Sequence, residues 1–423
     1  MLRVFHTADW HLGHLFHGFD RDWEHTAFLE WFLEKIAGQK PDALLIAGDV
    51  FDSVNPPAVA QRRFYDFLAR AHEAQPAMQV VIIAGNHDAA LRLEAPRELL
   101  RGLNISVVGT PARHEQGEID YDRFIVPLHD GSGTVHAVVA AVPFLRPHDV
   151  PEVKGAQDAY MDGVRELYRR AFEAARTAAK AWPGAALLAM GHCHLPDAAE
   201  SRDSERRIVI GAAEALPADT FPDDVAYVAL GHLHKAQELH GGRIRYSGSP
   251  IPLSFSEHAY EHRVLELILE GNQVASVAAL PIPRQTALLR LPAGGPAPLA
   301  EVLLAIEALP ADADLPDERK PYLEVRVLDE GPDPGRRRSI EQALAGKSVR
   351  LASIKAERAR GTGAETADVI GLPALADLSA MDPVEILTEA HRLKHGGAEP
   401  APALLAAFRE ILAAEAGNGG AAA

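Results

Sequence analysis

The stretch that decides the fold is residues 2–11, with the sequence LRVFHTADWH. The apolar run from residue 2 to residue 8 predicts a buried strand. Asp9 and His11 follow at its end, and in an extended chain two residues so spaced place their side chains on one face. The end of this strand can therefore direct two potential metal ligands toward one point.

Similar polar clusters recur along the chain, and four of the five clusters come at the end of an apolar, strand-like run. The four later ones are GDVFD (48–52), GNHD (85–88), GHCH (191–194) and GHLH (231–234). Open α/β sheets carry their ligands at the carboxyl ends of their strands. We therefore expect the five clusters to converge on one site.

The first part of the chain alternates between strand-like and helix-like patterns, which is the signature of an α/β layer. The predicted elements are strands at 2–8, 43–47 and 80–84, and helices at 22–37 and 56–72. Further strand-like runs continue to about residue 283. The predicted fold is a two-sheet α/β sandwich.

Composition restricts the class of protein. The chain has 423 residues, which favours two or three domains, and 47% of them are apolar, enough for a sizeable core. The net charge of −17 argues against a broadly basic nucleic-acid binder, although a local basic strip or a partner subunit could still supply phosphate contacts.

The compartment is expected to be reducing. Cys193 is the single cysteine, so a disulfide framework is excluded. Apolar runs stay below the roughly 18 residues of a membrane span, and the N-terminus enters a strand without signal-peptide features. We expect a cytoplasmic protein without membrane association.

Composition changes beyond residue 280, where prolines and glycines indicate a linker. Helix and strand patterns then alternate and predict a small α+β domain, followed by a segment rich in Gly, Thr and Ala and two short helical patterns too small to form a core. The expected division is 1–283 (main domain), 284–357 (small domain), 358–380 (flexible linker), 381–415 (docking helices) and 416–423 (disordered tail).

The clusters offer oxygen and nitrogen donors without a thiolate cluster, a set that suits Mn²⁺, Fe²⁺, Zn²⁺ or Mg²⁺ in five- or six-coordinate geometry. One carboxylate, Asp49, can bridge two ions. Two ions about 3.5–4 Å apart can clamp a phosphoryl group and activate water. Each motif alone has a structural interpretation, as a turn or a hydrogen-bonded core pair. Five together, in this order, favour a two-metal site.

These motifs resemble those of the calcineurin-like metallophosphoesterases. The match is closer to one branch, the bacterial DNA-repair exonuclease subunits called SbcD. The segments that carry it are TADWHLG (7–13), AGDVFD (47–52), YSGSPIP (246–252) and MDPVEI (381–386). The resemblance is strong to about residue 260 and looser beyond.

The resemblance implies a site with two divalent metal ions, with Mn²⁺ as the expected metal. It implies one ion held by Asp9, His11, Asp49 and His234, and a second held by Asp49, Asn86, His192 and His232. It makes His87 a non-ligand histidine that assists phosphodiester cleavage, with Asp88 orienting it. The family does not require a histidine at His194, and archaeal relatives carry a histidine where this chain has Asp52.

The resemblance also implies partners. The small domain is similar to a capping domain that helps to admit DNA, and Arg336–Arg338 is the densest basic run. The last helices resemble the segment that binds the SbcC ATPase, in an expected heterotetramer of two SbcC and two SbcD chains that includes an SbcD homodimer. The implied activity is 3′→5′ exonuclease on double-stranded ends and endonuclease on single strands and hairpins, in DNA repair, replication and recombination, gated by SbcC.

Other functions remain open at this point. A phosphomonoesterase or cyclic-nucleotide phosphodiesterase could use the same fold. Protein phosphatases of this superfamily carry Asp-Arg-Gly after the second aspartate, whereas Asp52 is followed here by Ser53 and Val54. A non-catalytic DNA-end scaffold would need a lost ligand, and no ligand is missing from the motifs.

Overall fold

The computed structural model describes residues 1–201, 205, 215–311, 315–331 and 333–357, with isolated positions between 384 and 408. Contacts divide the chain into a unit of residues 1–359 and a unit of residues 360–423. The expected linker at 358–380, most of the expected docking helices at 381–415 and the tail at 416–423 lie outside the described residues.

The first unit contains two six-stranded sheets, so the predicted two-sheet sandwich is confirmed. The first sheet has the order β14-β13-β1-β4-β5-β6. Strands β1, β4, β5 and β6 are parallel to one another, β13 is antiparallel to β1, and β14 is antiparallel to β13. Its strands are β1 (Leu2–Thr7), β4 (Ala43–Ala47), β5 (Gln79–Ile83), β6 (Ile105–Val108), β13 (Arg263–Glu270) and β14 (Gln273–Pro281).

The second sheet has the order β11-β12-β10-β9-β8-β7. Strands β8, β9, β10 and β12 are parallel, and the two edge strands are antiparallel to their neighbours. Its strands are β7 (Ile125–His129), β8 (Val135–Ala141), β9 (Ala186–His192), β10 (Val225–Gly231), β11 (Gln237–Leu239) and β12 (Ile244–Tyr246).

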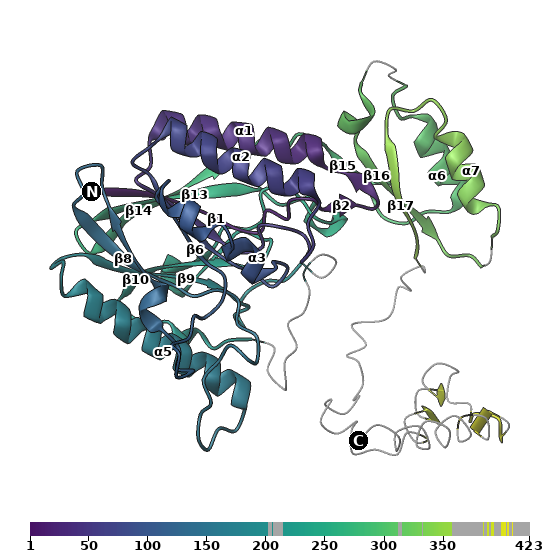
Figure 1. Ribbon diagram of the computed structural model, residues 1–423. Helices are drawn as coiled ribbons and strands as arrows, with labels where there is room; N and C mark the ends of the chain where they lie inside the picture. The colour runs from purple at the N-terminus through teal and green to yellow at the C-terminus, as the bar shows by residue number, and fades with distance from the viewer. Residues whose placement is uncertain are drawn as a thin grey trace. The chain divides into compact units, whose positions relative to one another are not determined.

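Helices cover the outer faces of both sheets, α1 (Asp22–Gln39) and α2 (Ala58–Ala74) on the first and α5 (Ala159–Ala179) on the second (Figure 1). The apolar spacing of α1 buries Phe28, Phe32 and Ile36, as predicted. Each such side chain contributes about 1.5–3 kcal/mol when fully buried. Asp158 caps α5 by accepting hydrogen bonds of 3.0 Å from the amides of Tyr160 and Met161.

The two sheets pack face to face around one apolar core. A polar contact crosses this core, where Nδ1 of His6 on β1 lies 2.9 Å from the hydroxyl of Tyr227 on β10. Nε2 of His6 lies 3.2 Å from the carbonyl of Leu230, so both ring nitrogens have partners. His6 is therefore a polar contact between the two sheets in which both ring nitrogens are partnered, as buried polar groups generally are.

A third sheet belongs to the small domain, whose strands β15, β16 and β17 are all parallel. A helix lies in each crossover, and α6 and α7 bury Val302, Ile306 and Ile340 against the sheet. The strand at Leu288–Leu291 adds to the pattern predicted from sequence. The elements are β15 (Leu288–Leu291), α6 (Leu299–Glu307), β16 (Tyr322–Leu328), α7 (Arg336–Ala343) and β17 (Arg350–Glu357).

Short elements complete the described part of the chain. They are β2 (Leu15–Phe16), β3 (Phe19–Asp20), α3 (Ala90–Glu94), α4 (Arg97–Arg101) and the 3₁₀ turns η1 (Tyr121–Phe124), η2 (Ala218–Thr220), η3 (His240–Gly242), η4 (Phe255–Glu257) and η5 (Asp317–Arg319). Within the described ranges, no helix combines the length and the apolar character that a membrane span requires.

Candidate metal centre

The loops that follow β1 and β4 run side by side. Asp9 N donates to Gly48 O and His11 N donates to Asp49 O, both at 3.0 Å. Asp9, His11 and Asp49 have φ angles of 56°, 46° and 47°, in the left-handed region that costs a non-glycine residue about 1–2 kcal/mol. The expected extended geometry of Asp9 and His11 is therefore wrong, because β1 ends at Thr7 and a tight loop aims these side chains.

Three of the predicted ligands form one group. Candidate ligand atoms of Asp9, His11 and His234 lie within 4.8 Å of one another. The rings of His11 and His234 have centroids 5.2 Å apart, and all three side chains are buried. The loop after β1 and the loop after β10 thus converge, as the strand-end pattern predicted.

A second group adjoins the first through Asp49. Its Oδ2 lies 3.3 Å from Nε2 of His192 and 3.6 Å from Nε2 of His11. Oδ1 of Asn86 lies 3.0 Å from Nε2 of His192 and 3.2 Å from Nδ1 of His232. The structure therefore brings all seven predicted metal ligands into one continuous cluster.

Two features of this cluster fit divalent cations. Oδ2 of Asp9 and Nε2 of His11 are buried without a hydrogen-bond partner, an unfavourable state for polar atoms. Burial alone would lower the pKa of His192, but the Asp49 carboxylate outweighs it and raises that pKa to about 9. Burial alone would raise the pKa of Asp49, but the nearby imidazoles hold it well below its usual range. The cluster therefore attracts positive charge, and its nitrogen and oxygen donors suit a divalent ion.

The outer nitrogens of His192 and His11 are occupied, which fixes the orientation of each ring. Nδ1 of His192 lies 2.9 Å from the carbonyl of Ala47, and Nδ1 of His11 lies 3.2 Å from Oδ1 of Asp52. Such contacts orient metal-binding histidines and select their tautomer. Asp52, without a role in the sequence interpretation, is thus a supporting partner of His11.

Sequence reasoning missed two acidic residues that hold His234. Oε1 of Glu257 lies 3.0 Å from Nδ1 of His234, and Oε1 of Glu205 accepts from the amide of His234 at 2.7 Å. Glu257 is fully buried in η4, and its Oε2 accepts from Leu253 N at 2.8 Å. Neither glutamate belongs to a motif or follows a strand end, so the sequence gives no indication that either contacts His234.

His87 lies beside the cluster, where it is buried and lines a cleft. Its Nδ1 is 2.7 Å from the carbonyl of Asp52, and its amide donates to Oδ1 of Asp49 at 2.8 Å. The rings of His87 and His11 have centroids 4.7 Å apart. Both rings line a cleft of about 530 Å³, together with His14 and Asp52. This cleft gives a substrate access to His87.

The carboxylate of Asp88 makes different contacts from those expected. Its carboxylate accepts hydrogen bonds from the amides of Gly85 at 2.9 Å, Phe51 at 3.0 Å and Val50 at 3.2 Å. The interpretation that Asp88 orients the His87 ring is therefore wrong, because the carbonyl of Asp52 holds that ring. Asp88 instead ties the loop after β5 to the loop after β4.

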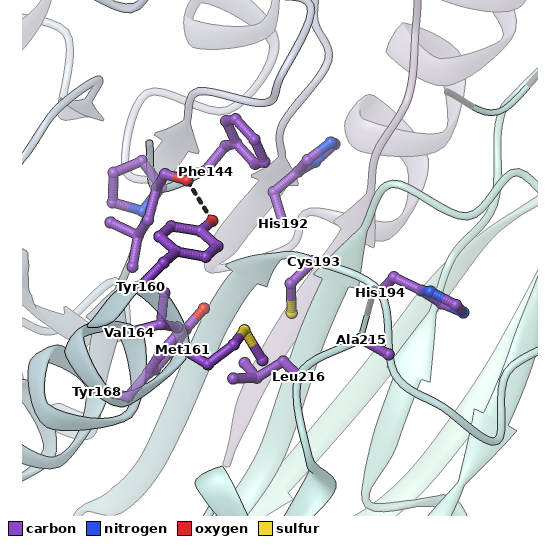
Figure 2. Close-up of a pocket in the computed structure, with 12 residues that line it drawn as sticks. Phe144, Tyr160, Met161, Val164, Tyr168, His192, Cys193, His194, Ala215 and Leu216 are labelled. Atoms are coloured by element: carbon purple, nitrogen blue, oxygen red, sulfur yellow. Dashed lines mark hydrogen bonds between the residues drawn. The ribbon is translucent and has the colours of Figure 1, made fainter. Parts of the chain in front are cut away.

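His194 and Cys193 lie apart from the cluster. Nε2 of His194 is 3.3 Å from Oε1 of Glu200. Figure 2 shows the Cys193 thiol directed toward Met161 and Leu216, in a cavity of about 50 Å³ behind His192. Burial raises the pKa of that thiol to about 12. Among the described residues, His194 belongs to no group of potential metal ligands.

Glycine is required where the loops approach most closely. Gly48 has a φ of +91°, and a Cβ there would lie 2.2 Å from Nδ1 of His192. A Cβ on Gly231 would lie 2.0 Å from the carbonyl of Ala47. The glycines of these two motifs therefore permit the contact between β4, β9 and β10 that assembles the cluster.

Comparison with known proteins agrees with this geometry. The family model described as calcineurin-like phosphoesterase matches residues 2–236, and the model described as type 5 capsule protein repressor C-terminal domain matches residues 284–394. The SbcD subunit of nuclease SbcCD from Rhodobacter capsulatus is 42% identical over 376 residues, 87% of this chain and 91% of the relative.

Two further relatives carry the same name. The SbcD subunit from Escherichia coli (strain K12) is 35% identical over 67% of this chain and 68% of the relative. That from Bacillus subtilis (strain 168) is 33% identical over 62% of this chain and 65% of the relative. The chain therefore belongs to the calcineurin-like phosphoesterases, within them to the SbcD subunits of SbcCD nucleases, and is a metal-dependent phosphodiester hydrolase.

Proposed function

We propose that this chain hydrolyses DNA phosphodiester bonds at a two-metal centre, as the nuclease subunit of a complex with an SbcC-type ATPase. The observation that carries the proposal is the position of Asp49, whose Oδ2 lies 3.3 Å from His192 and 3.6 Å from His11. A carboxylate placed between the ligands of two sets can bridge a pair of ions. The name of the relatives supports the nuclease and complex assignments.

The proposed ligand sets share this bridge. The first ion would take Asp9, His11, Asp49 and His234, and the second would take Asp49, Asn86, His192 and His232. Mn²⁺ is the proposed metal, because the resemblance to the SbcD subunits implies it; the oxygen and nitrogen donors by themselves would also suit Fe²⁺, Zn²⁺ or Mg²⁺. When bound, the ions supply Lewis acidity toward the phosphoryl oxygens and activate water for attack.

His87 is the proposed proton donor to the leaving oxygen. Its Nδ1 contacts the carbonyl of Asp52 at 2.7 Å, so the neutral ring would carry its proton on Nδ1. A protonated ring carries a second proton on Nε2, and His87 can transfer that proton within the cleft. Because His87 N also donates to Oδ1 of Asp49, the backbone of His87 is tied to the proposed bridging carboxylate.

The wider assignments are also proposals. The chain would act as a 3′→5′ exonuclease on double-stranded ends and as an endonuclease on single strands and hairpins, in DNA repair, replication and recombination in the cytoplasm. Residues 1–283 would form the nuclease domain and residues 284–357 a cap. Residues 381–415 would bind SbcC in an assembly of two copies of each chain. With a net charge of −17, the chain would take part of its DNA affinity from SbcC.

The test compares end-labelled duplex DNA, hairpin DNA and bis-p-nitrophenyl phosphate as substrates in Mn²⁺, with and without SbcC and ATP. We expect cleavage of hairpin DNA by the chain alone and stimulated degradation of duplex ends with SbcC and ATP. Asp49→Ala should remove every activity. Hydrolysis of the small diester without cleavage of any DNA would overturn the nuclease assignment.

A further inference from the structure

The small domain contacts the main domain through a buried tyrosine. Tyr322, on β16, packs its ring 4.6 Å from that of Phe16 and 5.8 Å from that of Phe19, between centroids. Phe16 and Phe19 pair across the hairpin β2–β3. This hairpin follows directly after His11 and His14, which line the cleft. The joint between the domains therefore lies close to the candidate metal centre along the chain.

A buried ion pair lies beneath this aromatic contact. The Tyr322 hydroxyl donates to Oε1 of Glu24 at 2.9 Å, and Nε of Arg21 donates to the same oxygen at 2.8 Å. Arg21 and Glu24 are each only 2% exposed. A buried charge that loses its partner is strongly unfavourable, so these three groups are expected to keep their arrangement together.

The ion pair continues toward the metal centre. Nη1 of Arg21 donates to the carbonyl of Pro252. The next residue, Leu253, lines the cleft and donates its amide to Oε2 of Glu257 at 2.8 Å. Oε1 of Glu257 lies 3.0 Å from Nδ1 of His234. A continuous set of contacts therefore leads from the small domain to the outer nitrogen of a candidate ligand.

We propose that Tyr322, Glu24 and Arg21 are positioning residues for the metal centre, acting through the loop that joins Pro252 to Glu257. They fix this loop, and Glu257 in turn fixes the ring of His234. The placement of the small domain thereby sets the affinity for the first ion. The inference rests on the proposed function, because it takes His234 as a metal ligand. A partner that contacts a ligand directly, as Glu257 contacts His234, typically changes metal affinity about 10–100-fold.

The alternative is that the network only holds the two domains together. Tyr322→Phe separates these roles, since it removes one hydroxyl and keeps the ring between Phe16 and Phe19. Arg21→Gln removes the charge and the contact with Pro252. Arg243→Gln is the matched control, because Arg243 also donates to two backbone carbonyls, those of Pro222 at 2.9 Å and Phe221 at 3.1 Å, away from the cluster.

The experiment measures Mn²⁺ binding to each full-length variant by calorimetry, together with the kcat and KM for bis-p-nitrophenyl phosphate. This small diester is chosen because it reports on the metal centre without a DNA strand. We expect Mn²⁺ affinity to fall about threefold to fivefold in Tyr322→Phe, as for the loss of one hydrogen bond. Mn²⁺ affinity should fall about 10–100-fold in Glu257→Gln and by a smaller factor in Arg21→Gln, and both variants should show a lower kcat and an unchanged KM. Arg243→Gln should bind Mn²⁺ like the wild type.

Wild-type Mn²⁺ affinity in both Tyr322→Phe and Arg21→Gln would overturn the inference, even if their thermal stability fell. The combination Tyr322→Phe with Glu257→Gln should bind Mn²⁺ no more weakly than Glu257→Gln alone, since both act on the same ring. Additive losses would also contradict the inference. A wild-type chain that binds no Mn²⁺ would instead overturn the proposed function itself.

Discussion

Oδ2 of Asp49 lies 3.3 Å from Nε2 of His192, although Asp49 follows β4 of the first sheet and His192 ends β9 of the second. The candidate metal centre is therefore built across the junction of the two sheets. Neither sheet alone supplies a complete ligand set. Metal binding and the packing of the sandwich are coupled for this reason, since an ion that binds the folded state stabilises it.

The first prediction tests this coupling. Saturating Mn²⁺ should raise the melting temperature of the wild type. The free energy of unfolding should increase by about 2.7 kcal/mol when the free ion is at about 100 times its Kd. Asp49→Ala removes the residue shared by both proposed ions, so Mn²⁺ should leave its melting temperature unchanged. Asp122→Ala, at an exposed aspartate, is the control and should respond like the wild type. A full Mn²⁺ response in Asp49→Ala would contradict a bridging role.

The second prediction concerns the glycine beside His192. Gly48→Ala introduces a methyl group that would lie 2.2 Å from Nδ1 of His192, at a φ of +91°. Gly184 has nearly the same φ, +90°, and a Cβ there would meet nothing within 4 Å, so Gly184→Ala isolates the backbone strain of about 1–2 kcal/mol. Gly48→Ala should lose more stability than this in urea unfolding and should bind Mn²⁺ at least tenfold more weakly. Equal behaviour of the two variants would show that His192 adapts freely.

Strand polarity explains why the sequence could predict much of the site. Parallel strands carry their carboxyl ends at one edge, so Asp9, Asp49 and Asn86 meet there once β1, β4 and β5 pair. The left-handed backbone of Asp9 and Asp49 could not be predicted, because contacts between the loops impose it.

The residues that contact the candidate ligands and their loops also could not be predicted from the sequence. Glu257 meets His234, and Asp88 meets the loop after β4, through irregular turns that have no periodic pattern. Such contacts depend on how distant segments pack, which local propensity does not determine. The motifs therefore identified the candidate ligands, while the residues that orient them emerged only from the fold.

The third prediction follows from the place of Asp88. Asp88→Ala leaves the amides of Gly85, Val50 and Phe51 buried without an acceptor, and each such loss costs about 1–3 kcal/mol. We expect a loss of at least about 3 kcal/mol in urea unfolding. Asp88→Asn keeps one acceptor oxygen and should lose less. If Asp88→Ala retained its stability and lost only catalysis, a direct role in the reaction would replace the structural one.

The fourth prediction separates catalysis from metal binding. His87→Ala removes the ring that faces the cleft and leaves the seven candidate ligands in place. The kcat for DNA cleavage should fall about 10²–10⁴-fold, the usual contribution of a proton donor, while calorimetry shows unchanged Mn²⁺ binding. His114→Ala, at a histidine with a 55% exposed side chain, provides the control. A parallel loss of metal in His87→Ala would make this residue a ligand.

The fifth prediction concerns the C-terminal segment. Every candidate ligand belongs to the unit of residues 1–359, whereas residues 360–423 form a separate unit. Deletion of residues 380–423 should therefore abolish co-purification with SbcC and leave Mn²⁺-dependent cleavage of single-stranded DNA intact. Deletion of residues 416–423 alone should leave both intact, because it spares the expected docking helices at 381–415. Co-purification of SbcC with the longer deletion would place the partner surface on the first unit.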